Sequence, residues 1–282
     1  MRSRLFSFLS CLLLSATAVQ TAHAVDLNQQ RKYYDEAKRA LAKGDSGPYQ
    51  MYATALADYP LEPYLEYDEL TARLKTASNP EIEKFLAEHG DLPQANWMKL
   101  RWLRWLAERG DWQTFVKYYD PKMKFVELDC LYGQYQLNSN KRAEGFASAE
   151  KLWMTGKTLP AACDGFFAQW AAAGQLTDQK RWQRAKLAAQ TRNYSLASTL
   201  VDSLNSLAPQ GRLLLAVAQK PEMVNNPSQF APVDEAMSDV VGLGLRRLAK
   251  QDRRKPCRCS MAMPRPCISP AKSRSRLPRK SV

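Results

Sequence analysis

PQANWMKLRWLRWLAER, residues 93–109, is the stretch of this chain that decides the fold. At helical spacing its apolar side chains fall on two faces. One face carries Met98, Trp102, Trp105 and Leu106, and the second carries Trp97, Leu100 and Leu103. A helix at the edge of a simple bundle needs one apolar stripe, whereas a helix with two stripes is covered on two sides, as in a layered solenoid. The stretch therefore predicts helices that stack in layers.

The rest of the body shows the same helical texture, and no run of alternating β-branched residues indicates a strand. We predict helices near 28–43, 46–58, 62–76, 80–88, 93–109, 111–119, 126–137, 141–155, 163–173, 178–190, 193–205 and 209–219. Short links between helices of this length are typical of stacked helical hairpins. Because no fixed repeat length emerges, the predicted fold class is all-α, an irregular α-superhelix of stacked helical hairpins rather than a regular repeat array.

Helix-ending signals support these boundaries. Gly44, Gly90 and Gly110 each stand where a helix C-terminus favours a left-handed residue, and each is followed by an Asp that can start the next element. Asn79 is predicted to cap the helix that Pro80 and Glu81 open.

The two ends of the chain differ from its body. Residues 1–24 have the form of a signal peptide, with cleavage after Ala24, and lipidation at Cys11 is the less favoured alternative. No later stretch is apolar enough for a membrane span. Residues 253–282 carry +10 of the net charge of +13, and the signal segment carries +2, so the body, 25–252, carries only +1. The basic balance is therefore no argument for nucleic acid as a partner.

Two interpretations of the basic segment 253–282 stay open. A Lys/Arg-rich end can bind anionic surfaces such as DNA or acidic lipid. The interpretation we favour is that the segment is translated out of frame, because its Arg, Pro, Ser and Cys content begins abruptly after a helical stretch. With either origin, the segment lacks the apolar residues that a fold of its own requires.

Cys130 and Cys163 are the cysteines of the body. Export to an oxidising compartment favours a disulfide between them, and two separate buried thiols are the alternative. Cys257, Cys259 and Cys267 lack the usual spacing of zinc ligands, so no metal site is predicted there.

The body offers no recognisable catalytic motif. His89 has no nucleophile motif beside it, and a polar role near a helix C-terminus is the expected one. Phosphate loops, dinucleotide fingerprints and the zinc motif His-Glu-x-x-His are missing from the sequence. We therefore predict no catalytic, cofactor-binding or metal-binding residues in this chain.

Several side-chain groups have both a functional and a structural interpretation, and the structural one is favoured for each. Glycan cleavage needs a carboxyl group held protonated by an apolar site, yet the acidic residues sit at spacings that suit exposed helix faces. We interpret the basic clusters as solvated helix faces. We expect the tryptophans to belong to the core rather than to form platforms for sugar rings. The acidic residues are Glu62, Glu66, Glu69, Glu81 and Glu83, and the basic clusters are Lys99, Arg101 and Arg104, and Lys180, Arg181, Arg184 and Lys186.

The block from Tyr59 to Leu70, with its Tyr-Pro-Leu-x-Pro-Tyr start, resembles the opening of the soluble lytic murein transglycosylases. Leu100 to Trp105 and Gly110-Asp111-Trp112 are similar as well, and the likeness extends over roughly 26–252. The resemblance implies a U-shaped, ring-like α-superhelix, and the spacing of Cys130 and Cys163 looks like that family's ring disulfide. It further implies a periplasmic enzyme that cleaves MurNAc–GlcNAc bonds of peptidoglycan to 1,6-anhydro products without metal or cofactor.

The family's catalytic Glu-Ser pair and Gly-Leu-Met-Gln segment do not occur in these 282 residues. We therefore expect a superhelical domain that lacks its catalytic domain and is inactive alone. The alternative is a stand-alone helical-repeat adaptor that binds protein partners in the cell envelope. The expected organisation is a signal peptide at 1–24, a superhelical domain at 25–252 and a basic tail at 253–282.

Overall fold

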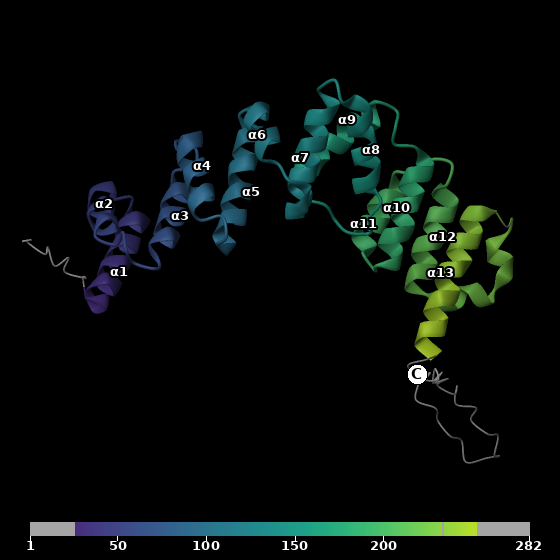
Figure 1. Cartoon of the computed structure of the whole chain (residues 1–282). Coiled ribbons are helices and arrows are strands. Elements are labelled where there is room, and N and C mark those ends of the chain that lie inside the picture. Colours follow the sequence, from purple (N-terminus) through teal and green to yellow (C-terminus); the bar gives the residue numbers. More distant parts are fainter. Residues whose placement is uncertain (1–25, 233, 253–282) are drawn as a thin grey trace, which may run out of the picture. The chain divides into compact units, whose positions relative to one another are not determined.

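A computed structural model describes residues 26–232 and 234–252, and Figure 1 shows them as helices joined by turns. The predicted signal peptide with its cleavage site at Ala24 and the basic segment 253–282 lie outside the described residues. Within the described part of the chain there is no strand, so the all-α prediction is confirmed. The described residues divide into two compact units, with the boundary between Leu128 and Asp129.

The described residues of the first unit fold as successive antiparallel neighbours. They form α1 (Leu27–Lys43), α2 (Ser46–Thr54), α3 (Glu62–Ala72), α4 (Asn79–Glu88), α5 (Pro93–Glu108), α6 (Trp112–Tyr118) and the 3-10 turn η1 (Pro121–Met123). Helix α1 packs on α2, α3 packs on both α4 and α5, and α5 packs on α6. The helices therefore contact their neighbours along the chain, as hairpins in a stack do.

Helix α5 has the two covered faces that its sequence predicts, with one exception. Met98, Trp102, Leu103 and Leu106 are fully buried, and Leu100 nearly so. The prediction is wrong for Trp97, whose side chain is 53% exposed and contacts Phe125 at one edge, with 5.6 Å between the ring centroids.

Three boundary predictions can be compared with the backbone. Gly44 and Gly110 adopt the left-handed conformation, with φ of 78° and 77°, as predicted. Gly90 does not, so the prediction is wrong there; a Cβ at Gly90 would lie 2.7 Å from the Leu86 carbonyl oxygen, and close approach explains this glycine.

The start of α4 also differs from its prediction. Ser78, not Asn79, is the cap, and it forms a capping box with Glu81. Asn79 is the first helical residue, and its side chain is used for contacts with later helices.

The described residues of the second unit are also helical. Helix α7 (Val126–Leu137) spans the boundary, and α8 (Arg142–Trp153), η2 (Ala161–Cys163), α9 (Asp164–Ala172), α10 (Asp178–Gln190), α11 (Tyr194–Asp202), α12 (Ala208–Gln219), η3 (Pro221–Asn225), η4 (Pro227–Phe230) and α13 (Glu235–Asp252) follow. Helix α13 lies beyond the last of the predicted helix ranges, and it includes the helical stretch that precedes the basic segment in the sequence. It packs on α12 and η3.

The core of the second unit is aromatic at one end and built from small residues at the other. Trp153, Phe166, Phe167 and Trp170 pack together around α8 and α9. Helix α10 instead buries alanines, Ala185, Ala188 and Ala189, which allow α11 and α12 to approach closely.

Candidate functional site

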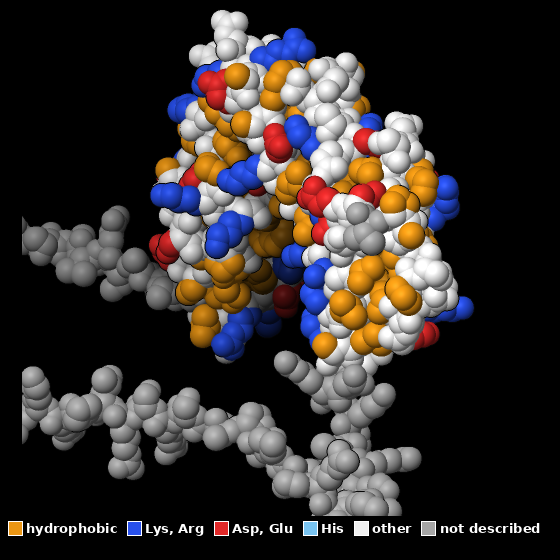
Figure 2. All heavy atoms as spheres, turned by 90° about the vertical axis from the view of Figure 1, so that its right-hand side faces the viewer, with side chains coloured by type: hydrophobic (Ala, Val, Ile, Leu, Met, Phe, Trp, Pro, Cys, Tyr) orange, Lys and Arg blue, Asp and Glu red, His pale blue; other side chains and the backbone are white. Residues whose placement is uncertain are grey.

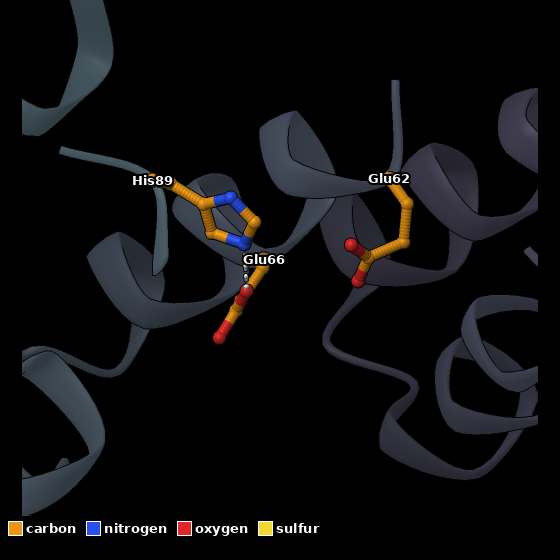
Figure 3. A group of neighbouring side chains, drawn as sticks. All are labelled: Glu62, Glu66 and His89. Atoms are coloured by element: carbon orange, nitrogen blue, oxygen red, sulfur yellow. Dashed lines mark ion pairs between the residues drawn. The ribbon is translucent and has the colours of Figure 1, made fainter. Parts of the chain in front are cut away.

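Two carboxylates and His89 form a cluster in the first unit that the sequence did not reveal. Glu62 and Glu66 stand one turn apart on the same face of α3, and His89 ends α4. Helix α3 begins at Glu62, where an acidic side chain favours the positive end of the helix and Pro63 suits the first turn. Figure 3 shows the imidazole of His89 turned toward the two glutamates across the α3–α4 hairpin.

The three side chains are close enough to act as one site. His89 Nε2 lies 3.3 Å from Glu66 Oε2, as the dashed line in Figure 3 marks. One ligand atom from each of Glu62, Glu66 and His89 lies within 4.8 Å of the others. The His89 and Glu66 side chains are 22% and 28% exposed. Within the described residues the Glu62 carboxylate has neither a hydrogen bond nor an ion pair, so the cluster holds more negative charge than its own pairing balances.

Partial burial changes the acidity of both carboxyl groups. Burial raises the pKa of Glu62, and the neighbouring charge of Glu66 raises it further, while His89 lowers it. Burial likewise raises the pKa of Glu66, against the lowering effect of His89. The expectation that these two glutamates sit on exposed helix faces is therefore wrong, because the α3–α4 hairpin covers them in part.

The two basic clusters behave differently from one another. Arg101 and Arg104 are exposed, as predicted, and Arg104 Nε pairs with Glu127 at 2.9 Å. In the second cluster the prediction of a solvated face is wrong for Arg184, which is 5% exposed. Its guanidinium carbon lies 4.1 Å from the centre of the Trp153 ring, and Lys186 pairs with Asp239 of α13. Arg184 and Lys186 therefore make structural contacts, whereas Arg101 and Arg104 stay on an exposed helix face.

Most tryptophans serve the core, as predicted. Trp102, Trp170 and Trp182 are fully buried, and Trp153 is nearly so. Trp97 is the exception described above, so it alone of these five could present an open ring face to a sugar.

Cys130 and Cys163 form a disulfide that joins α7 to η2, with Cα atoms 5.0 Å apart. Both residues are fully buried. The bond therefore holds α7 against the turn η2, which leads directly into α9 and its aromatic side chains.

Pockets in the described part of the chain include four that Glu62, Glu66 and His89 do not line. The most apolar of them, about 390 Å³, lies between η3, η4 and α13 and includes Phe230, Met237 and Leu245. Leu245 is 54% exposed, and hydrophobic side chains gather on this end of the second unit, above the last turns of α13 (Figure 2). Glu62 and Glu66 do not line these four pockets.

No helix among the described residues combines the length and the apolar character that a membrane crossing requires.

Comparison with known proteins relates these helices to one group. The soluble lytic murein transglycosylase of Escherichia coli K12 is 27% identical over 243 residues, which are 86% of this chain and 37% of the relative. That of Salmonella typhimurium is 30% identical over 201 residues, or 71% of this chain and 31% of the relative. The chain thus spans about a third of the length of the curated relatives that it matches.

Solved structures show the same relationship. A lytic transglycosylase from Pseudomonas aeruginosa, crystallised as an inactive mutant, has a TM-score of 0.75 and 62% identity, covering 79% of this chain and 36% of that one. The 70 kDa soluble lytic transglycosylase of E. coli has a TM-score of 0.67 and 26% identity, covering 80% and 37%. The fold and these likenesses make the described helices homologous to part of the lytic transglycosylases. The curated relatives that they match are soluble lytic murein transglycosylases.

One family model points elsewhere. The model for the Cucumovirus coat protein matches residues 126–212, 87 of the 282 residues. Viral capsid domains are commonly double-sheet jelly rolls. Residues 126–212 instead form α7 to α11 and the start of α12, so this match assigns no function.

Proposed function

We propose that residues 25–252 are the superhelical scaffold of a soluble lytic transglycosylase, an exported protein of the periplasm. The full-length enzyme would cleave MurNAc–GlcNAc bonds of peptidoglycan to 1,6-anhydro products in cell-wall turnover. The observation that carries the proposal is the match to the P. aeruginosa lytic transglycosylase, at 62% identity over 79% of this chain. At that identity the helices correspond in sequence as well as in fold.

The described residues suit a scaffold better than a catalytic site. Glycan cleavage by carboxyl groups needs an acid that an apolar pocket keeps protonated beside a bound sugar. Glu62 and Glu66 are the paired carboxyl groups with raised pKa values, but Glu66 is bound to His89 and both lie outside the four pockets. We therefore assign the cleavage step to residues other than Glu62 and Glu66, and to this chain the role of associating with peptidoglycan.

Co-sedimentation of the purified mature chain with peptidoglycan sacculi tests this role. We expect the chain to pellet with sacculi and to be released by soluble glycan fragments that compete for it. Retention in the supernatant, together with recovery of one specific envelope protein in a pull-down, would instead support a helical-repeat adaptor. A second chain of similar charge and size, such as a helical protein unrelated to the cell wall, controls for non-specific adhesion to sacculi.

A further inference from the structure

We infer that Glu62, Glu66 and His89 form a binding site for a divalent transition-metal ion of the Zn²⁺ type. Two carboxylate oxygens and one imidazole nitrogen come from adjacent elements, α3 and the end of α4. Three protein ligands with a fourth position open to water are a common arrangement for Zn²⁺.

The geometry allows all three side chains to reach one ion. Carboxylate oxygens bind Zn²⁺ at about 2.0–2.2 Å and imidazole nitrogens at about 2.0–2.1 Å. The three ligand atoms lie within 4.8 Å of one another, so an ion between them needs only small rotations of the glutamate side chains. Figure 3 shows the Glu66 carboxylate beside the His89 ring and the Glu62 carboxylate across from them on the same face of α3.

The charge of the cluster favours a cation. The Glu62 carboxylate has no hydrogen bond or ion pair within the described residues, and Glu66 shares one oxygen with His89. Lys84, a nearby cation, is 67% exposed and pairs with Glu88; its charge lowers the pKa of Glu62 and Glu66, but within the described residues it forms no ion pair with either. A half-buried carboxylate without a partner is costly unless something neutralises it, and a bound ion would do so.

The donor set selects among metals. Mg²⁺ and Ca²⁺ prefer sites built from oxygen alone, whereas imidazole suits Zn²⁺, Cu²⁺ and Ni²⁺. We therefore expect Zn²⁺ to bind and Mg²⁺ to compete poorly. Because its ligands come from α3 and from the end of α4, a bound ion would tie these two elements together.

Isothermal titration of the whole chain with ZnCl₂ tests the inference. Cys11, Cys257, Cys259 and Cys267 should be replaced by Ser in every sample, because free thiolates bind Zn²⁺ strongly, while Cys130 and Cys163 stay in their disulfide. We expect one Zn²⁺ per chain. Glu62→Gln and His89→Gln should each weaken binding by at least about tenfold, since even the loss of an outer-shell partner costs that much.

Glu88→Gln is the matched control. It removes the same charge as Glu62→Gln, and Glu88 lies next to His89 in sequence but outside the cluster. It should leave Zn²⁺ binding within about twofold of the parent. The visible spectrum of the Co²⁺-loaded chain gives a second readout, and its tetrahedral bands should disappear in His89→Gln.

Three outcomes would overturn the inference. The first is no Zn²⁺ binding to the parent chain at millimolar concentration. The second is equal binding by the parent, Glu62→Gln and His89→Gln, which would place the ion elsewhere. The third is a loss on His89→Gln alone with no effect of Glu62→Gln, which would leave no three-ligand site. Circular dichroism of each variant confirms that it is folded, and Glu62→Gln, which breaks no hydrogen bond or ion pair, keeps the test decisive if His89→Gln unfolds.

Discussion

The side-chain amide of Asn79 donates a hydrogen bond to Asp111 Oδ2 at 3.1 Å, and so joins the first residue of α4 to the cap of α6. The Asn79 carbonyl oxygen accepts hydrogen bonds from the Trp102 indole at 3.1 Å and from Arg109 at 2.8 Å. Three helices thus meet in one polar network at the edge of the first unit's core. Because Trp102 is fully buried, the loss of its acceptor would leave a polar group without a partner.

Asn79→Ala should therefore destabilise the chain by about 1–3 kcal/mol, the cost of an unsatisfied buried donor. Asp111→Ala should cost about 1–2 kcal/mol, since it removes the cap of α6. Urea unfolding followed by circular dichroism measures both. Asp120→Ala is the control, because Asp120 caps only the single turn of η1, and its effect should be smaller. Equal, negligible changes in all three variants would show that the network does not contribute to stability.

The same network predicts a pH dependence. Burial alone would raise the pKa of Asp111, but hydrogen bonds from Thr114, Asn79 and Arg109 outweigh it and lower the pKa to about 2. A carboxyl group whose pKa is lower in the folded state stabilises the fold above its ordinary pKa, and that contribution is lost as the pH falls. It amounts to at most about 2 kcal/mol, and it should disappear between about pH 4 and pH 2.

Asp111→Asn isolates this effect, because Asn is also a good cap but does not titrate. The difference in unfolding free energy between the parent and Asp111→Asn should shrink from pH 5 to pH 2. Glu81 contributes a similar pH dependence, because hydrogen bonds from Arg73 and Ser78 also lower its pKa to about 2. That contribution is the same in the parent and in Asp111→Asn, so it cancels in the difference between their unfolding free energies. A difference that stays constant over this range would contradict the assignment.

Arg184 offers a test of a buried charge without an acidic partner. Its guanidinium stacks on Trp153, within 5.8 Å of the Phe167 ring centre as well, and burial lowers its pKa. Replacing a buried charge by an apolar side chain of similar volume is often neutral or stabilising. Arg184→Met should thus change the unfolding free energy by less than about 1 kcal/mol, whereas Arg184→Ala should lose about 2 kcal/mol or more through the cavity it leaves. Equal losses in both variants would mean that the charge itself is required.

The disulfide should be a major source of stability for the second unit. Cys130 and Cys163 are 33 residues apart, and closing a loop of that size is worth about 3–4 kcal/mol in the chain-entropy model. The double variant Cys130→Ala with Cys163→Ala should lose that amount in urea unfolding. Reduction with dithiothreitol should lower the stability of the parent by a similar amount and leave the double variant unchanged. A loss below about 1 kcal/mol would indicate that packing around Trp170 suffices.

Two glycines should respond oppositely to the same substitution. A Cβ at Gly156 would lie 2.4 Å from the backbone oxygen of Leu187, so Gly156→Ala forces α8's end away from α10 and should cost more than about 2 kcal/mol. Gly47 lies inside α2 with open space around it, and Gly47→Ala should stabilise by about 0.5–1 kcal/mol. Thermal unfolding of the two variants gives the sign directly. A similar effect of both would contradict the close approach at Gly156.

Local chemistry made much of the fold predictable. Short stretches of sequence were enough to predict several features of the fold. These are the two apolar stripes of α5, the left-handed glycines at 44 and 110, and the cap at Asp111. Ser78 was missed as the cap because Asn79 is an equally good one, and only the packing of Trp102 decides that Asn79 is drawn into the helix.

The glutamate–histidine cluster could not be found in the same way. Glu62 and Glu66 have the spacing of an ordinary helix face, and His89 is 23 residues further along the chain. Only the packing of α3 on α4 brings the imidazole to the carboxylates. The available signal was an i, i+4 pair of acidic residues together with a histidine further along the chain, and it is too common to be specific. Arg184 was misread for a similar reason, since burial on Trp153 is a tertiary event.

The most direct test of the central claim is the analysis of products released from peptidoglycan sacculi by the purified chain. The E. coli 70 kDa soluble lytic transglycosylase serves as the positive control. If the described helices are a scaffold, the chain alone should release no 1,6-anhydro products above background. Release of such products at an enzymatic rate, lost in Glu62→Gln or Glu66→Gln, would contradict the account and make the cluster a catalytic site.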